Sequence, residues 1–133
     1  MDNSKPPFQA MNQTNNTNAK SPQALQGVRV LDLTRILAGP WCTQTLADLG
    51  ADVSKIGQGG DDTRRWGPPF LKDKDGHDSV ESAYFMCANR NKRSVTCDIS
   101  QPAGQALIRK LVMQRDVPVA NSKAGDLARN GLD

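Results

Sequence analysis

The feature that most constrains the fold is a pair of apolar segments that flank a short helical segment, all within about 30 residues. Residues 28–33 read Val-Arg-Val-Leu-Asp-Leu and have the composition of a buried strand. Residues 41–49 have the composition of a helix, with Pro40 in its first turn and Gly50 after its last residue. Residues 51–56 return to a strand pattern. A strand, a helix and a strand at this spacing predict a βαβ unit, which implies parallel strands and an α/β fold.

The rest of the chain continues this alternation after one long interruption. Residues 57–79 carry many glycines, prolines and charges, so we expect a surface excursion there and no core element. Apolar side chains recur at i and i+4 in residues 101–115, which is typical of a helix with one buried face. Pro118 removes a hydrogen-bond donor and confines its strand to an edge of the sheet. The expected elements are a helix over 80–88, a strand over 94–99, a helix over 101–115 that Ser100 caps, an edge strand over 117–120 and a helix over 124–129.

Composition limits the size of the folded part. Leu, Ile, Val and Phe together make up 26 of the 133 residues, which suits one domain with a modest core. Residues 1–24 contain eight Asn or Gln side chains and few large apolar ones. Polar amides do not compensate the entropy lost when a backbone is ordered. We therefore expect residues 1–24 to form a disordered tail and residues 25–133 to fold.

Charge and cysteine content argue against several classes of protein. The net charge of +3 is too small for a dedicated nucleic-acid-binding protein, and no apolar run is long enough to cross a membrane. The N-terminus lacks the patterns of a secretory signal and of a transit peptide. Three cysteines without a Cys-x-x-Cys pair predict neither a disulfide framework nor a zinc site. We therefore expect a soluble, cytoplasmic protein with reduced thiols, in which Cys42 and Cys87 are buried within helices.

Local motifs single out few places for chemistry. A parallel sheet binds ligands at the carboxyl ends of its strands, here the loop over residues 34–40. This loop lacks the glycine patterns of dinucleotide and Walker sites, and it fits a binding loop and a simple connection equally. The aspartates of the excursion, Asp61 included, are expected to be solvated. The spacing around His77 fits neither a catalytic histidine nor a calcium loop, so no metal site is expected. The basic cluster at residues 89–94 fits either a phosphate contact or a solvated connection.

Four longer strings carry a resemblance to a known family. They are GVRVLDLTRILAGPWCTQTLADLGADVSKI from Gly27, GGDDTRRWGPPF from Gly59, ESAYFMCANRNKRSVTCDI from Glu81 and NSKAGDLARNGLD from Asn121. In order and spacing, they resemble the N-terminal part of the class III CoA-transferases. This is the family of formyl-CoA transferase, carnitine CoA-transferase and α-methylacyl-CoA racemase. The resemblance covers essentially all of residues 27–133.

The resemblance implies a Rossmann-like parallel sheet with flanking helices, as the truncated N-terminal part of a larger fold that forms an interlocked homodimer. It also implies that coenzyme A, as acyl-CoA, binds along the loops at the strand ends. The positions that match the family are Ile36, Leu37 and Ala38 in the first loop, Cys97 and Asp98 at a strand end, and Asn121, Lys123 and Arg129 further along the chain. Two departures weaken the expected binding: Gln58 replaces an arginine suited to the CoA phosphates, and Ser122 replaces an aromatic side chain suited to adenine.

The activity that the resemblance implies is transfer of CoA from an acyl-CoA to a carboxylic acid through an aspartyl thioester. The family's nucleophilic aspartate belongs to a segment after residue 133, so no catalytic residue is assigned here and the chain alone is expected to be inactive. The expected partners are an acyl-CoA, a carboxylic acid and a second copy of the chain. The two acids, and the choice between transferase and racemase, do not follow from these residues. The alternative is a non-catalytic remnant or CoA-binding module.

Overall fold

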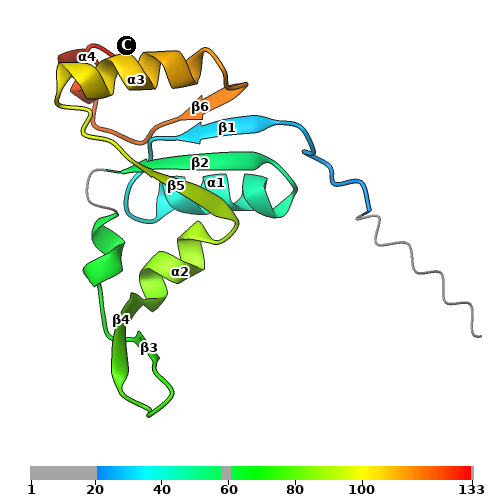
Figure 1. Ribbon diagram of the computed structural model, residues 1–133, viewed down its shortest axis with the longest axis vertical. Coiled ribbons are helices and arrows are strands. Elements are labelled where there is room, and N and C mark those ends of the chain that lie inside the picture. Colours follow the sequence, from blue (N-terminus) through cyan, green and yellow to red (C-terminus); the bar gives the residue numbers. More distant parts are fainter. Residues whose placement is uncertain (1–20, 58–60, 133) are drawn as a thin grey trace, which may run out of the picture.

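The computed structural model describes residues 21–57 and 61–132 (Figure 1). Its centre is a four-stranded sheet with the strand order β5-β2-β1-β6, in which every neighbouring pair is parallel. The strands are β1 (Arg29–Asp32), β2 (Asp52–Gly57), β5 (Lys92–Thr96) and β6 (Val117–Val119). The α/β class and the parallel βαβ unit predicted from the sequence are confirmed.

Helices cover both faces of the sheet, as Figure 1 shows. Their bounds are α1 (Ala38–Asp48), between β1 and β2; α2 (Ala83–Asn89), before β5; α3 (Pro102–Val112), between β5 and β6; and α4 (Asp126–Arg129), after β6. None of the helices in the described part is long and apolar enough to cross a membrane.

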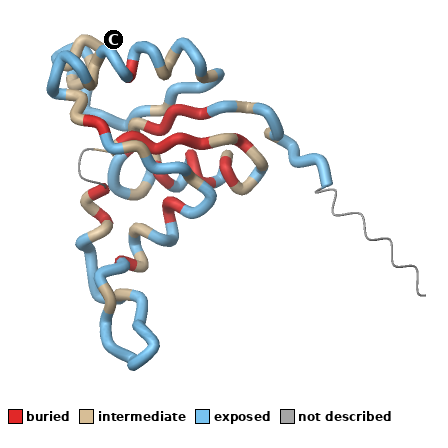
Figure 2. The backbone as a smooth tube through the Cα atoms, in the orientation of Figure 1, coloured by how far each residue is buried: buried red, intermediate tan, exposed pale blue. Residues whose placement is uncertain are grey.

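Successive side chains of β1 belong to two different apolar clusters. Val30 packs with Ala47 of α1, whereas the next residue, Leu31, packs with Ile108 of α3. Successive side chains of a strand point to opposite faces, so α1 and α3 lie on opposite sides of the sheet. Figure 2 shows buried residues concentrated in the two central strands, β1 and β2.

An arm projects from the sheet, below it in Figure 1, where the sequence predicted a surface excursion. The Asp73 carboxylate accepts hydrogen bonds from the backbone nitrogens of Asp75 and His77, which fixes a tight turn between two antiparallel strands. This hairpin was not expected, and its second strand includes Val80, which the sequence assigned to a helix. The elements of the arm are the 3₁₀ helix η1 (Asp62–Arg65), β3 (Phe70–Lys72) and β4 (Asp78–Ser82).

The ends of the helices differ from the expected ones for local reasons. Helix α1 begins at Ala38, three residues before the expected start, because Pro40 is compatible with a first turn. Ser100 does not cap α3, which begins at Pro102. The backbone nitrogen and hydroxyl of Ser100 instead donate to the Asp98 carboxylate, at 2.9 and 2.6 Å.

The later strands are close to expectation. Strand β5 begins at Lys92, two residues before the expected start, and ends at Thr96. Strand β6 pairs only with β1 within the described sheet, and Pro118 therefore lies in an edge strand, as predicted.

Most of the expected tail, residues 1–20, lies outside the described residues. The described chain is tied to the core soon after it starts. The backbone nitrogen of Leu25 donates to the carbonyl of Leu49 at 2.9 Å, and the Leu25 side chain packs against the α1-side cluster. The Gln23 side chain lies close to Gly50, the residue that follows α1 and Leu49. A Cβ added to Gly50 would lie only 2.5 Å from the Cβ of Gln23.

The predicted burial of two cysteines is wrong. Cys42 and Cys87 are exposed, and only Cys97 is buried among the three cysteines. Helix α1 buries Pro40, Thr43 and Ala47 with helical spacing, and Cys42 therefore faces away from the sheet.

We predict that Gly104→Ala destabilises the protein. A Cβ at residue 104 would lie 1.9 Å from the carbonyl oxygen of Asp98, so α3 and the loop after β5 would have to separate. Helix propensity alone favours alanine by about 1 kcal/mol. Overpacking instead predicts a loss of about 1–3 kcal/mol in the free energy of unfolding, measured by urea denaturation. The exposed control Lys110→Ala should change little, and a gain in stability for Gly104→Ala would contradict the steric account.

Candidate functional site

The strand order predicts a ligand-binding crevice at the carboxyl edge of the sheet. Counted in chain order, the four strands lie as 3-2-1-4, so β1 has the second strand on one side and the fourth on the other. The connection after β1 leads through α1 to β2, whereas β6 is reached from β5 through α3, so the strand order reverses between β1 and β6. In open α/β sheets, ligands bind outside the carboxyl ends of the strands at such a point of reversal. Here this point lies between the ends of β1 and β6.

Two loops meet at this crevice. The Asn121 side chain accepts a hydrogen bond from the backbone nitrogen of Arg35 and donates one to the backbone oxygen of Arg35, each at 2.9 Å. The backbone nitrogen of Leu33 also donates to the carbonyl of Val119 at 2.8 Å, which extends the pairing of β1 with β6. These contacts fix the loop after β1 against the segment after β6.

The same loop contains an unusual backbone conformation. Ile36 has a φ of +68°, in the left-handed region that β-branched residues rarely adopt. Such a conformation costs about 1–3 kcal/mol and persists only where surrounding contacts hold it. The backbone nitrogen of Ile36 lies 3.4 Å from the Asp61 carboxylate, which accepts its hydrogen bond.

The Asp32 carboxylate lies fully buried at the end of β1. Its Oδ1 accepts hydrogen bonds from the backbone nitrogen and hydroxyl of Thr34, at 2.9 and 2.5 Å. Its Oδ2 accepts from the hydroxyl of Thr43 at 2.6 Å and from the Lys92 ammonium at 3.0 Å. The carboxylate thus connects β1, the following loop, α1 and β5.

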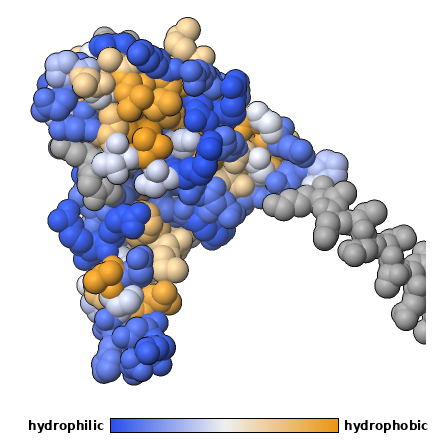
Figure 3. Space-filling model, viewed as in Figure 1, coloured by the Kyte–Doolittle hydropathy of each residue, from blue (hydrophilic) through white to orange (hydrophobic). Residues whose placement is uncertain are grey.

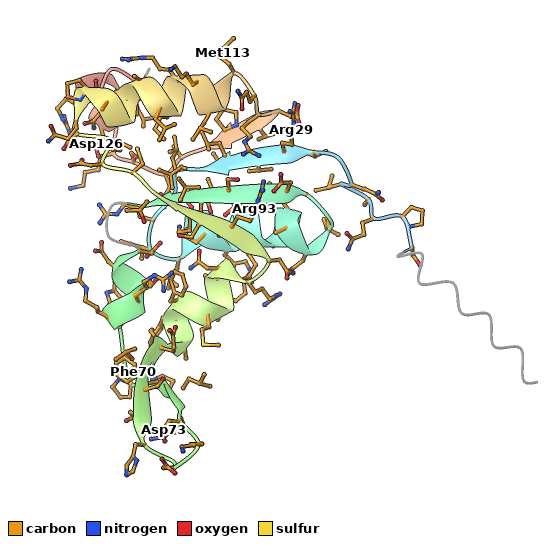
Figure 4. All side chains as sticks on the ribbon, in the orientation of Figure 1. Arg29, Phe70, Asp73, Arg93, Met113 and Asp126 are labelled. Atoms are coloured by element: carbon orange, nitrogen blue, oxygen red, sulfur yellow. The ribbon has the colours of Figure 1, made fainter. Side chains whose placement is uncertain are left out.

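Lys92 is buried with this carboxylate, although the sequence allowed either a phosphate contact or a solvated connection. Its Nζ also donates to the carbonyl of Pro40 at 2.8 Å and to the side-chain oxygen of Asn89 at 3.1 Å. The exposed neighbour Arg93, labelled in Figure 4, instead pairs with Asp52 at 2.5 Å. Within the basic cluster, Lys92 is therefore a structural cation.

Lys55 extends the group of buried charges toward the loop. Its Nζ donates to the carbonyl of Thr34 at 2.8 Å and lies 3.0 Å from the Asp61 carboxylate. Asp61 also accepts from the backbone nitrogen and hydroxyl of Thr63, at 3.1 and 2.8 Å, so its expected solvation is wrong. We refer to the four side chains as the buried charge cluster: Asp32, Lys55, Asp61 and Lys92.

The carboxylates of this cluster favour their ionised form. Burial raises the pKa of Asp32, but the charge of Lys55 and hydrogen bonds from the neighbouring threonines outweigh it, so the pKa lies below its ordinary value. Burial likewise opposes ionisation of Asp61, yet bonds from Thr63 and Lys55 lower its pKa as well. Both carboxylates therefore bind protons less readily in the folded protein.

A pocket of about 160 Å³ opens beside the cluster. Leu33, Ile56 and Ile99 contribute its apolar wall, and Arg35 and Cys97 also line it. A second pocket of about 130 Å³ shares Lys55, Gly57 and Asp61 with the first, and the Arg64 guanidinium lies 3.7 Å above the ring of Phe85 at its wall.

The residues that the sequence assigned to CoA binding lie at this edge in different environments. Ile36, Leu37 and Ala38 form the turn after β1 and the start of α1. Cys97 is buried and lines the pocket of about 160 Å³. Asp98 is not among the lining residues, and its carboxylate accepts bonds within the turn before α3.

The segment after β6 carries the remaining assigned residues. The Asn121 side chain contacts the first loop, and Lys123 is exposed. The Arg129 guanidinium pairs with Asp126, labelled in Figure 4, and stays 71% exposed. Gln58, where the sequence departs from the family, lies outside the described residues.

Sequence reasoning did not identify the buried charge cluster. The available signal was an ionisable residue within an apolar strand pattern, as Asp32 is in residues 28–33 and Lys55 in residues 51–56. Charged side chains are almost never fully buried unless they are paired. Two opposite charges in adjacent predicted strands therefore indicate a contact at one end of the sheet.

The parallel strand order with its point of reversal and the helices on both faces define a Rossmann-like α/β domain, a class that binds nucleotide-containing ligands at this edge. The chain belongs to CoA-transferase family III, whose family model matches residues 25–133. The family resemblance found in the sequence is confirmed.

Two characterised relatives illustrate the similarity. The chain is 50% identical over 122 residues to a succinate–glutarate CoA-transferase of Agrobacterium fabrum. This match covers 90% of this chain and 30% of that protein. It is 46% identical over 110 residues to a succinyl-CoA:glutarate CoA-transferase of Homo sapiens, covering 81% of this chain and 24% of that protein. The chain therefore spans less than a third of the length of either relative.

Solved structures confirm the fold. A CaiB/BaiF family protein from Brucella suis superimposes with a TM-score of 0.76 at 49% identity, covering 85% of this chain and 29% of that chain. A hypothetical protein from Mycobacterium tuberculosis gives a TM-score of 0.74 at 33% identity, covering 86% and 30%.

We predict that Asp32→Asn lowers the free energy of unfolding at pH 7 by about 3–5 kcal/mol, because it leaves the charge of Lys92 buried without its ionic partner. The matched control is Asp116→Asn, which removes an exposed pair with Arg29 and should have little effect. Urea denaturation measures both. Equal stability of Asp32→Asn and wild type would contradict the role given to the cluster.

Acid should reduce the difference in the free energy of unfolding between wild type and Asp32→Asn within a defined range of pH. The folded pKa values of Asp32 and Asp61 lie below the unfolded value of about 3.9, so their contribution to stability is complete above that pH. It is lost as the pH falls through the folded values. We expect the stability of wild type and of Asp32→Asn to converge below about pH 4, whereas a constant difference down to pH 2 would contradict the linkage.

Proposed function

We propose that this chain forms the CoA-binding N-terminal part of an enzyme that moves CoA between an acyl-CoA and a carboxylic acid. The observation that carries the proposal is the meeting, at the carboxyl ends of β1 and β6, of the loop containing Ile36 with the segment that begins at Asn121. The pocket at the ends of β1, β2 and β5 opens beside this loop. Family membership supports the CoA ligand. The chain spans about 30% of the Agrobacterium relative, so the complete activity belongs to a longer protein.

Coenzyme A combines anionic phosphates with an uncharged pantetheine arm, and the edge offers a match for each. Lys123 and Arg129 supply exposed positive charges for the phosphates. The apolar wall of Leu33, Ile56 and Ile99 suits the pantetheine arm. A pocket of about 160 Å³ is smaller than the roughly 300–1,000 Å³ typical of small-molecule sites, so it would accept only the end of that arm.

Arg129 must exchange one partner for another to bind a phosphate. Its pair with Asp126 is exposed and is worth about 0.2–1 kcal/mol. A charge-assisted hydrogen bond to a phosphate is worth about 1.5–3 kcal/mol, so the exchange favours the ligand. The exposed position of the guanidinium leaves it free to move.

The proposed reaction exchanges thioester and carboxylate. The C–S bond of the donor thioester breaks, and the donor acid leaves as a carboxylate that carries one oxygen of the enzyme's aspartate, which now holds CoA as a thioester. CoA then forms a new C–S bond to the carbonyl carbon of the acceptor, and one acceptor oxygen stays on the enzyme and restores the aspartate. Asp61 borders the pocket, but its hydrogen bonds from Thr63 and its pairing with Lys55 suit a structural role. The nucleophilic aspartate is therefore proposed to lie in the longer protein, beyond these residues.

A second copy of the chain is the other proposed partner. Trp41, Val80 and Met113 are large apolar side chains that lie exposed in the described part of the chain. Figure 3 shows further apolar surface between α3 and β5 and on the arm. Light scattering of the purified protein, which gives its molar mass, tests the dimer.

We predict that the chain binds CoA and that Lys123→Ala and Arg129→Ala each weaken the affinity by about tenfold or more, since each removes a positive charge near the phosphates. Lys74→Ala is the control, because Lys74 is an exposed lysine in the turn of the arm. Titration calorimetry measures the dissociation constants. No binding by wild type, or an equal loss for the control, would contradict the proposed site.

A transfer assay separates the enzyme from a CoA-binding module. Because its relatives are named for succinyl and glutarate substrates, we propose succinyl-CoA and glutarate as the first pair to test. The chain alone should form no glutaryl-CoA above background, whereas a longer form with the missing aspartate should. Turnover by the chain alone that an aspartate substitution within 27–133 abolishes would show that the nucleophile lies here. Binding without transfer by the longer form would favour the module.

A further inference from the structure

We propose that the side-chain amide of Asn121 is a positioning group, which holds the loop after β1 in the conformation that binds CoA and does not itself bond to CoA. The inference rests on the proposed function for its ligand. It differs from the direct contact that the family resemblance implies for this position. It depends on where the two ends of the Asn121 amide are already engaged.

Both ends of that amide bind the backbone of one residue. Oδ1 accepts from the nitrogen of Arg35, and Nδ2 donates to the oxygen of Arg35, each at 2.9 Å. This reciprocal pair fixes the orientation of both peptide groups that flank Arg35. A ligand that took either end of the amide would have to release one of these bonds.

The loop needs such support because of its next residue. Ile36 has a φ of +68°, and a β-branched side chain strongly disfavours this region. Among the residues that the structure describes, its backbone nitrogen has one bond, a long one of 3.4 Å to Asp61. Without Asn121, rotation of Ile36 to a negative φ would therefore meet little resistance, and it would displace Leu37 and the start of α1.

Three side chains from separate parts of the chain hold three consecutive residues of this loop. Lys55 of β2 binds the carbonyl of residue 34, Asn121 binds both backbone groups of residue 35, and Asp61 binds the nitrogen of residue 36. Lys55 and Asp61 are buried and paired with each other, whereas Asn121 is exposed. Asn121 is thus the contact that can be removed without breaking the buried charge cluster.

The strain at Ile36 makes the positioning role measurable. If an unsupported loop occupies the binding conformation about one tenth of the time, the apparent affinity for CoA falls about tenfold. Glycine adopts positive and negative φ about equally, so a loop with glycine at position 36 occupies that conformation about half the time without Asn121. The effect of removing the Asn121 amide should therefore depend on the residue at position 36.

The test is a double-mutant cycle on the full 133-residue chain, with coenzyme A titrated by calorimetry. Asn121→Ala should weaken binding about tenfold in the wild-type background but only about twofold in the Ile36→Gly background. Amide hydrogen exchange without CoA supplies an independent readout. The Ile36 amide, which Asn121 does not contact, should exchange faster in Asn121→Ala if the loop relaxes.

The matched control is Asn91→Ala. Asn91 is also exposed and also has a positive φ, of 62°, and its side chain donates to Asp48 at 2.8 Å near the start of β5, away from the crevice. This variant should lose stability while its CoA affinity and the exchange at Ile36 stay at the wild-type values.

The outcomes separate the two proposals. The same tenfold loss in both backgrounds, with unchanged exchange at Ile36, would show that Asn121 contacts CoA and would overturn the positioning role. No loss in either background would overturn it as well. If wild type binds no CoA, the proposed function fails, and the exchange rate at Ile36 still decides whether Asn121 holds the loop.

Discussion

The Asp32 carboxylate connects the end of β1, the loop after it, α1 and β5, which form much of the candidate site. It ends β1, binds the loop at Thr34 and α1 at Thr43, and pairs with Lys92 of β5. Transferring a charge from water to the protein interior costs several kcal/mol, so the buried carboxylate stays ionised only while all these partners surround it. The loop, α1 and β5 are therefore positioned together. Lys55 and Asp61 extend the same arrangement to the carbonyl of Thr34 and to the backbone nitrogen of Ile36.

The α/β fold was largely predictable from local patterns because those patterns reflect burial. The strands over 28–33 and 51–56 and the helix between them alternate with the period of the sheet and helix that they form. The hairpin of the arm was not predictable in this way, since a turn held by the Asp73 carboxylate and strands exposed on both faces leave no apolar period. The wrong prediction that Cys42 is buried has a similar origin. The residue types around Cys42 predict a helix, but they do not show which face of α1 is buried.

The candidate site was predictable in part. The family resemblance located residues 36–38, 97–98 and 121–129 along the chain, and the structure brings these segments to the carboxyl edge of the sheet. It did not indicate how Asn121 is used, because a hydrogen bond between residues 86 positions apart leaves no local pattern. The buried charge cluster was missed for a different reason. An isolated aspartate or lysine in a strand pattern resembles a solvated position until its partner is identified.

The proposed function requires CoA to bind at the carboxyl edge of the sheet, beside the ends of β1 and β6. Backbone amide chemical shifts of the isotopically labelled chain, recorded with and without CoA, locate the bound ligand. We expect the shift changes to concentrate in residues 34–38, 97–98 and 121–129. Shifts confined to the arm, residues 70–82, or to the opposite edge of the sheet around Asp52 and Asn91 would contradict it.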